Sequence, residues 1–199
     1  MIIRQLLRFV PAVLAIGLLS APAAAGAASD LVRQKQTKLF ATVARPKTAA
    51  RQAALRRLFD GMLDYQAFAE GSLGKKWKDR TEEERVRFRD LLEKLVRNNY
   101  KRNLKKMLDY QVQYRGEDAA EKGSIIVHTM AKHKTDTREP ALQIDFRLAK
   151  VGGGYKVVDI ITENASMVKT YRSQFLRIIR KKSFAKLIEK LEKKLAKQD

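Results

Sequence analysis

The sequence predicts an α+β fold in which an antiparallel four-stranded curved sheet packs under helices, with an apolar cavity between the layers. The first observation is the helical spacing of apolar residues up to about residue 108. The second is their alternation with polar residues between about 110 and 161, and the third is helical spacing again from about 166. Strands that follow one another without intervening helices favour a meander covered by helices over a parallel sheet. Periodicity does not tell whether side chains fill the space between the layers.

The N-terminal residues are expected to lie outside this domain. Arg4 and Arg8 precede an apolar run, Phe9–Leu19, and small residues follow it as far as Ala28. Positive charge, a short apolar run and then small residues are the order of a secretory signal peptide. The run is shorter than the roughly 20 residues of a membrane-spanning helix. We therefore expect a signal peptide at 1–28, a single domain at 29–199 and a periplasmic location.

Helical segments are expected before the strands at about 31–45, 48–63 and 82–108, with a short aromatic segment at 64–78. Asp30 can cap the first of them, and Pro46 ends it. Thr81 and Glu84 have the spacing of a capping box, in which each side chain bonds the backbone N–H of the other residue. The capping box predicts the start of the longest helix, whose apolar positions keep one face over several turns.

The strands are expected at about 110–114, 125–130, 142–148 and 155–161. The third alternates between apolar and polar residues, which is typical of a half-buried antiparallel strand. Gly152-Gly153-Gly154 is expected to turn the chain so that the last two strands form a hairpin. Two helices follow, at about 166–181 and 183–197, and Ser166 is expected to cap the first.

The net charge and the cysteine content exclude some classes of function. The chain has a formal charge of +20 and no cysteine. The absence of cysteine excludes thiol chemistry and Cys-ligated zinc. Such a charge usually indicates a nucleic-acid partner. In an exported protein it favours anionic membrane surfaces or acidic patches on other proteins instead, so we expect no nucleic acid.

Residues that could carry catalysis or hold a metal are few. His128 and His133 lie five apart on an extended chain, so their side chains point to opposite faces and a shared metal site is not expected. Asp145 and Asp159 come close in the predicted hairpin and could form a carboxylate pair, although pairing with the many lysines and arginines is the favoured reading. We therefore expect no enzyme, no metal and no cofactor.

Two blocks of sequence resemble MlaC-like periplasmic carriers, the family also called toluene-tolerance proteins. The first is Gly71-Ser72-Leu73-Gly74-Lys75-Lys76-Trp77 followed by Thr81-Glu82-Glu83-Glu84-Arg85 and Phe88. The second is Tyr155-Lys156-Val157-Val158-Asp159-Ile160, then Asn164-Ala165-Ser166-Met167-Val168 and Tyr171-Arg172-Ser173-Gln174-Phe175. Asn164-Ala165 departs from the Gly-Val that is common in the family before this serine.

The resemblance implies a monomeric phospholipid carrier of the Mla pathway. Its cargo would be a phospholipid, and its partners an outer-membrane lipoprotein complex and the lipid-binding subunit of an inner-membrane ABC transporter. Combined with the alternation and helical spacing, it suggests a lipid pocket between the inner face of the sheet and the helices. The expected lining residues are Phe68, Leu73, Trp77, Phe88, Leu92, Leu95, Ile126, Ile144, Phe146, Val158, Ile160, Ala165, Met167, Val168, Tyr171 and Phe175. Ala165 and Met167 are expected at its mouth.

Two alternatives stay open on the sequence. One is a basic membrane-surface or nucleic-acid-binding protein whose core is filled by side chains. The other is a small enzyme on a cone-like α+β fold, with Asp145 or Asp159 in a polar cavity.

Overall fold

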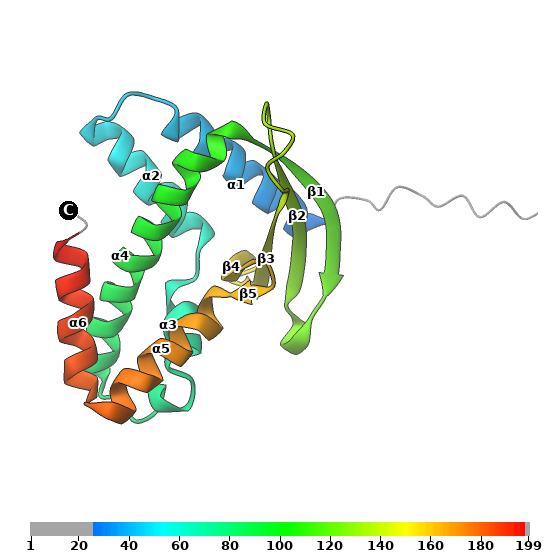
Figure 1. The fold of residues 1–199 in the computed structure, drawn as a ribbon. Coiled ribbons are helices and arrows are strands. Elements are labelled where there is room, and N and C mark those ends of the chain that lie inside the picture. The colour runs from blue at the N-terminus through cyan, green and yellow to red at the C-terminus, as the bar shows by residue number, and fades with distance from the viewer. Residues whose placement is uncertain (1–25, 198–199) are drawn as a thin grey trace, which may run out of the picture.

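The computed structural model describes residues 26–197, and the signal peptide predicted at 1–28 lies almost entirely outside them. Helices precede and follow an antiparallel sheet, as the sequence predicts (Figure 1). The helices are α1 (Ala27–Val43), α2 (Ala49–Met62), α3 (Tyr65–Leu73), α4 (Glu82–Lys106), α5 (Met167–Lys181) and α6 (Phe184–Ala196). Within the described residues, no helix combines the length and hydrophobicity that a membrane span requires.

The sheet has five strands rather than the predicted four. They are β1 (Tyr110–Ala119), β2 (Ile125–His133), β3 (Leu142–Val151), β4 (Gly154–Thr162) and β5 (Ala165–Ser166), in that order and all antiparallel. The fifth strand follows a two-residue turn in which Glu163 and Asn164 both have positive φ, as tight hairpins require. At two residues it is too short to produce an alternating pattern in the sequence.

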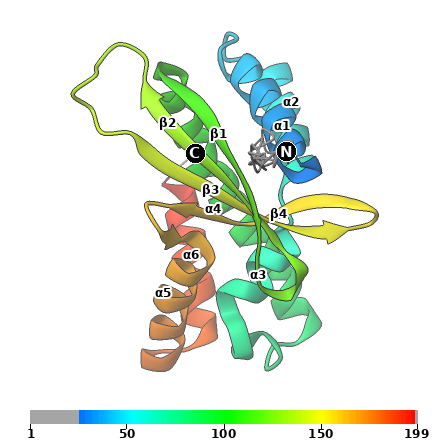
Figure 2. The ribbon, with the colours of Figure 1, turned by 90° about the vertical axis from the view of Figure 1, so that its right-hand side faces the viewer.

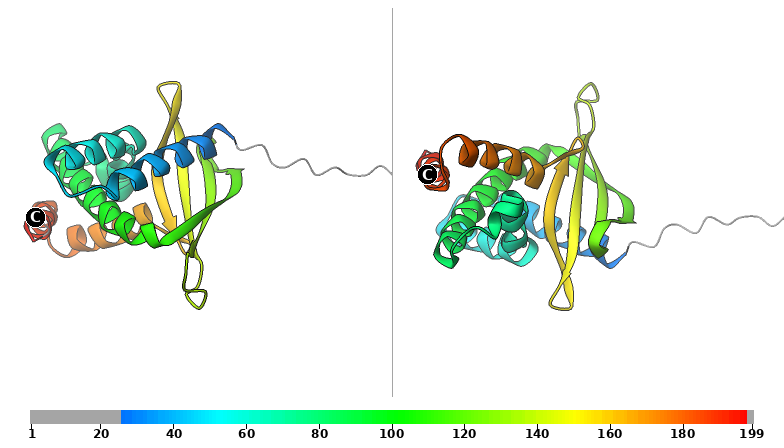
Figure 3. Two further views of the ribbon diagram at one scale, coloured as in Figure 1. Left: turned by 90° about the horizontal axis from the view of Figure 1, so that it is seen from above. Right: turned by 90° about the horizontal axis from the view of Figure 1, so that it is seen from below.

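The helices lie on one face of this curved sheet. Seen from above and from below, the helical layer stands to one side of the strands (Figure 3). In the view of Figure 2, α1 and α2 lie at the upper right and α5 and α6 at the lower left, on opposite sides of the strands. The long helix α4 runs from the α6 end to the sheet and leads directly toward β1, so it joins the two regions.

Local capping explains most helix starts. Thr81 and Glu84 form the predicted capping box of α4. Ser166 caps α5 by accepting a hydrogen bond from the Lys169 backbone N–H at 3.0 Å. Thr48 and Ser183 cap α2 and α6 in the same way.

The start of α1 differs from the prediction, which placed Asp30 at the cap. The helix begins at Ala27, and Ala28 is fully buried although it was assigned to the signal peptide. The Glu117 carboxylate on β1 accepts hydrogen bonds from the backbone N–H and the hydroxyl of Ser29, both at 2.8 Å. A carboxylate supplied by a distant strand stabilises this helix start, and local sequence does not reveal such a partner.

A β-bulge changes which residues of β4 face the helices. Arg147 pairs with Asp159 and Leu148 pairs with Val157, so the register skips Val158. Val157 is therefore fully buried beneath the helices, whereas Val158 is half-buried on the other face. The prediction that Val158 faces inward is wrong for this reason.

Candidate functional site

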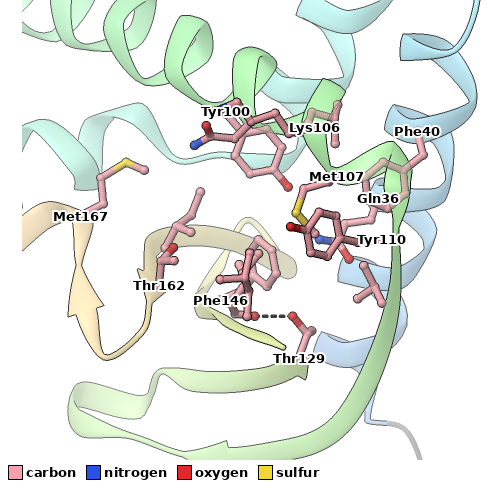
Figure 4. Close-up of a pocket in the computed structure, with 16 residues that line it drawn as sticks. Gln36, Phe40, Tyr100, Lys106, Met107, Tyr110, Thr129, Phe146, Thr162 and Met167 are labelled. Carbon is pink, nitrogen blue, oxygen red and sulfur yellow. Dashed lines mark hydrogen bonds between the residues drawn. The ribbon is translucent and has the colours of Figure 1, made fainter. Parts of the chain in front are cut away.

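A pocket lies between the sheet, α1 and the end of α4, and we call it the sheet pocket. Its volume is about 280 Å³. It is lined by Gln36, Phe40, Tyr100, Asn103, Leu104, Lys106, Met107, Tyr110, Val112, Thr129, Leu142, Ile144, Phe146, Ile160, Thr162 and Met167. Tyr100 and Lys106 approach from α4, Phe146 from the sheet and Phe40 from α1 (Figure 4). Most of the wall is apolar, with polar atoms at few points.

Two hydroxyl groups beside this space are hydrogen-bonded within the protein. The Tyr114 hydroxyl on β1 donates to Gln36 Oε1 at 2.5 Å. The Thr129 hydroxyl donates to the carbonyl of Ile144. Burial raises the pKa of Tyr100 to about 12 and that of Tyr114 to about 12. Both phenols are therefore neutral at ordinary pH and act as hydrogen-bonding groups, not as acids or bases.

Four of the predicted lining residues border the sheet pocket, namely Ile144, Phe146, Ile160 and Met167. The strand alternation therefore identified part of its floor. Two other sheet residues were assigned to the wrong face. Ile126 pairs with Arg147 and so lies on the outer face, whereas its neighbour Val127 pairs with Phe146 and is fully buried.

Most of the predicted helical residues fill a core instead of bordering the pocket. Phe68, Leu73, Phe88, Leu92, Leu95, Val168, Tyr171 and Phe175 are all buried within it. The Phe88 and Phe175 rings pack edge to face with 5.6 Å between their centroids, and the Tyr171 ring stacks on that of Phe175 with 5.3 Å between centroids. Trp77 is half-buried at the edge of this core, and Ala165 is exposed on β5. None of these residues is among those that line the sheet pocket.

The contribution of α1 and of the last turns of α4 to the wall of the sheet pocket was not predicted from the sequence. Gln36 and Phe40 come from α1, and Tyr100, Leu104 and Met107 from the end of the apolar stripe of α4. The stripe itself was visible in the sequence. Its last turns lie closest to the strands because β1 begins immediately after them, and this proximity was the available signal.

The two aspartates of the hairpin are structural. Asp145 accepts hydrogen bonds from the Thr129 backbone N–H and from Gln143 Nε2, at 3.2 and 2.7 Å, and its carboxylate lies 3.0 Å from His128 Nδ1. Asp159 accepts from the Ser166 hydroxyl at 2.5 Å and the Val168 N–H at 3.1 Å. The expectation that lysines and arginines neutralise them is wrong, since neither has such a partner within residues 26–197.

These aspartates do not build a reaction centre around the pocket. Neither side chain lines the sheet pocket. His128 also contacts Asp118, whereas His133 accepts from the backbone N–H of Asp136 at 2.9 Å, so the histidines have separate partners. Among the described residues, no cluster of three or more His, Cys, Asp or Glu has the arrangement of a metal site.

The two sequence blocks that carry the family resemblance meet where α3 packs on α5. Arg172 Nε donates to the carbonyl of Gly71 at 2.6 Å. A Cβ at Gly71 would lie 2.7 Å from Val168 Cγ1, so only glycine allows this close approach. Gly74 has a φ of 55° and ends α3 beside the same arginine. The blocks therefore join α3 to α5, and Ile160 and Met167 of the second block also border the sheet pocket.

Comparison with known proteins identifies the family of this chain. The MlaC protein family matches residues 33–193. The chain belongs to the MlaC family. A similar solved structure, at a TM-score of 0.71 and 21% identity, covers 87% of this chain and 99% of its own. It is described as the phospholipid-binding protein from Ralstonia solanacearum in complex with a phospholipid, and at this identity it supports the shared fold. No curated protein matches the chain.

Proposed function

We propose that this MlaC-family protein is a periplasmic phospholipid carrier that holds acyl chains in the sheet pocket. It shuttles lipid between an outer-membrane lipoprotein complex and an inner-membrane ABC transporter. Membership of the MlaC family carries the proposal. The similar fold of a protein described in complex with a phospholipid supports it, as does the signal-like pattern of residues 1–28.

The chemistry of the sheet pocket suits an acyl chain. Its wall is mainly apolar and its phenols stay neutral, so no buried charge opposes a hydrocarbon. Two chains of about 15 methylenes, at about 0.8 kcal/mol each, represent on the order of 24 kcal/mol of apolar transfer. A carrier must offset most of that free energy without exceeding it greatly, or the lipid would either stay in the membrane or never leave the protein.

The volume of the sheet pocket limits how much of a phospholipid it can hold. At about 280 Å³ it is slightly smaller than typical ligand pockets, which range from about 300 to 1,000 Å³. A diacyl lipid therefore requires the walls to separate. We infer that α1 and the end of α4 move away from the sheet, since the opposite wall is part of a continuous β-ladder.

The experiment expresses the full chain, extracts the purified protein with organic solvent and measures phospholipid per protein by mass spectrometry. Ile144→Trp places a large ring in the sheet pocket and is expected to lower the bound phospholipid several-fold. Val151→Trp changes an exposed residue of the same strand and serves as the matched control. Absence of phospholipid from the unsubstituted protein, or equal lipid content in the two variants, would contradict the proposal.

A further inference from the structure

A second pocket, of about 720 Å³, lies beside the sheet pocket, and we call it the basic pocket. It is bounded by the connection between α1 and α2 and by the last turns of α4. Its charged residues on the first side are Arg45, Lys47 and Arg51. Those on α4 are Lys101, Arg102, Lys105 and Lys106. No aspartate or glutamate is among the described residues that line it.

These cations are not neutralised by the protein. None of them forms an ion pair with any acid in residues 26–197. The ion-pairing arginines of this region, Arg56 and Arg97, lie outside the basic pocket and contact Asp60. The pocket therefore concentrates positive charge that lacks a counter-charge, which raises the local concentration of anions.

Helix stability does not explain the arrangement fully. Lys105 and Lys106 lie at the C-terminal end of α4, where the helix dipole favours cations. Lys101 with Lys105, and Arg102 with Lys106, are like charges four residues apart, however, and such pairs are unfavourable on a helix. Burial and the charges of Lys47 and Arg51 lower the pKa of Lys101, which shows that cations from both walls act on one another.

Arg51 stabilises the end of α1 but does not use all of its hydrogen-bond donors. Its Nη1 donates to the carbonyls of Val43 at 3.1 Å and Arg45 at 2.7 Å, which satisfies acceptors at the end of α1. Its Nε is buried and has no partner among the described residues. A buried donor without a partner is unfavourable unless a ligand or water accepts from it.

The two pockets share a residue. Lys106 lines both the basic pocket and the sheet pocket (Figure 4). A molecule with a hydrocarbon part in the sheet pocket would therefore reach the cations with a polar group a short distance away. We propose that the basic pocket holds the phosphate-bearing head group of the bound lipid and selects head groups with a net negative charge. This inference rests on the proposed function.

The charge of the head group gives the selectivity. A phosphoglycerol head group carries one negative charge. A phosphoethanolamine head group carries the same phosphate together with an ammonium, which the surrounding lysines and arginines repel. Partly exposed pairs of this kind differ modestly in free energy, so we expect a roughly three- to tenfold preference for the anionic lipid. The preference declines with salt, because the cations are accessible to solvent.

In the test, the full chain is expressed and stripped of lipid. The protein is then incubated with vesicles that contain equal amounts of phosphatidylglycerol and phosphatidylethanolamine. After removal of the vesicles, mass spectrometry gives the ratio and total of the bound lipids. Substituting Lys47, Lys101 and Lys105 with Gln should return the ratio toward that of the vesicles. Lys106 is left intact because it also lines the sheet pocket.

A matched control removes the same charge elsewhere. Lys181, Lys190 and Lys194 are exposed on α5 and α6, and their substitution with Gln should keep the preference. A lipid ratio equal to that of the vesicles in the unsubstituted protein would overturn this inference alone. So would a loss of preference in both triple variants, because net charge would then explain it. Absence of every lipid would overturn the proposed function and this inference with it.

Two further readouts separate other sources of the same anion. If inorganic phosphate stabilises the lipid-free protein through these three lysines while the lipid ratio stays unselective, the basic pocket binds a free anion. If the lysines control co-sedimentation with phosphatidylglycerol vesicles but not the bound-lipid ratio, the pocket binds a membrane surface. Either outcome would overturn the head-group assignment.

Discussion

The region around α3, α5 and α6 is filled, whereas the region between the sheet, α1 and the end of α4 is not. In the first, the ring centroid of Phe88 lies 5.6 Å from that of Phe175 and 6.1 Å from that of Phe184, and all three rings are buried. In the second, side chains leave a pocket of about 280 Å³ beside a basic one of about 720 Å³. One helix, α4, contributes its N-terminal half to the filled region and its C-terminal half to the open one.

The apolar face of one helix can therefore pack in a filled core along one part and border a pocket along another. Phe88, Leu92 and Leu95 are at most 1% exposed and pack in the core. Tyr100 and Met107, further along the same stripe, border the sheet pocket. Both stretches have helical spacing, so the pattern alone does not tell a filled space from an open one. What distinguishes them is the partner: helices with aromatic rings at one end, and a curved sheet at the other.

The largest expected effect compares truncation in the two regions. Phe88→Ala should lower the free energy of unfolding by about 3–5 kcal/mol, because it opens a cavity in a filled core. Ile144→Ala, beside a pocket that already exists, should lower it by only about 1 kcal/mol. Urea unfolding of lipid-free protein measures both. Equal losses would show that the two regions are packed alike.

The family motif at the α3–α5 junction gives the next effect. Gly71→Ala adds a Cβ 2.7 Å from Val168 Cγ1, and overpacking of this kind costs about 1–3 kcal/mol. Val168→Ala in the same chain removes the clashing atom, so the double variant should be more stable than the sum of the single losses predicts. Denaturant midpoints of the four proteins measure the coupling. Additive losses would show that the junction tolerates the added methyl group without strain.

Features set by nearby residues could be predicted from the sequence. The capping box at Thr81 and Glu84, the cap at Ser166 and the four long strands are examples. Each depends on side chains and backbone within a few positions, so spacing suffices to identify it. The family could also be predicted, because its motifs form one junction with specific requirements, such as the glycine opposite Val168.

Features that depend on residues distant in the chain could not be predicted from the sequence. The Glu117 carboxylate that receives Ser29 is 88 positions away in the chain, so the true start of α1 was hidden. The bulge at Val158 shifted the inward position of β4 from Val158 to Val157 while Ile160 kept its predicted face, and a one-residue shift is enough to do so. Ile144, Phe146 and Ile160 border the sheet pocket because the strand alternation holds at these positions, and Met167 borders it from the start of α5. The predicted helical residues that fill the core depended on how helices pack.

The smallest expected effect lies on the exposed side of α6, where the filled region meets solvent. Glu189 accepts hydrogen bonds from Lys186 at 2.6 Å and Lys193 at 2.7 Å, and these lower its pKa from 4.5 to about 2. Because the pKa is lower in the folded protein, the pairs stabilise the fold above about pH 4.5, and this contribution is lost as the pH falls toward 2. Glu189→Gln should therefore cause a small loss of stability at pH 7 and none near pH 2, and the loss should shrink with salt. Thermal unfolding across pH measures it. A loss that stays constant with pH would show that the side chain acts through packing and not through its charge.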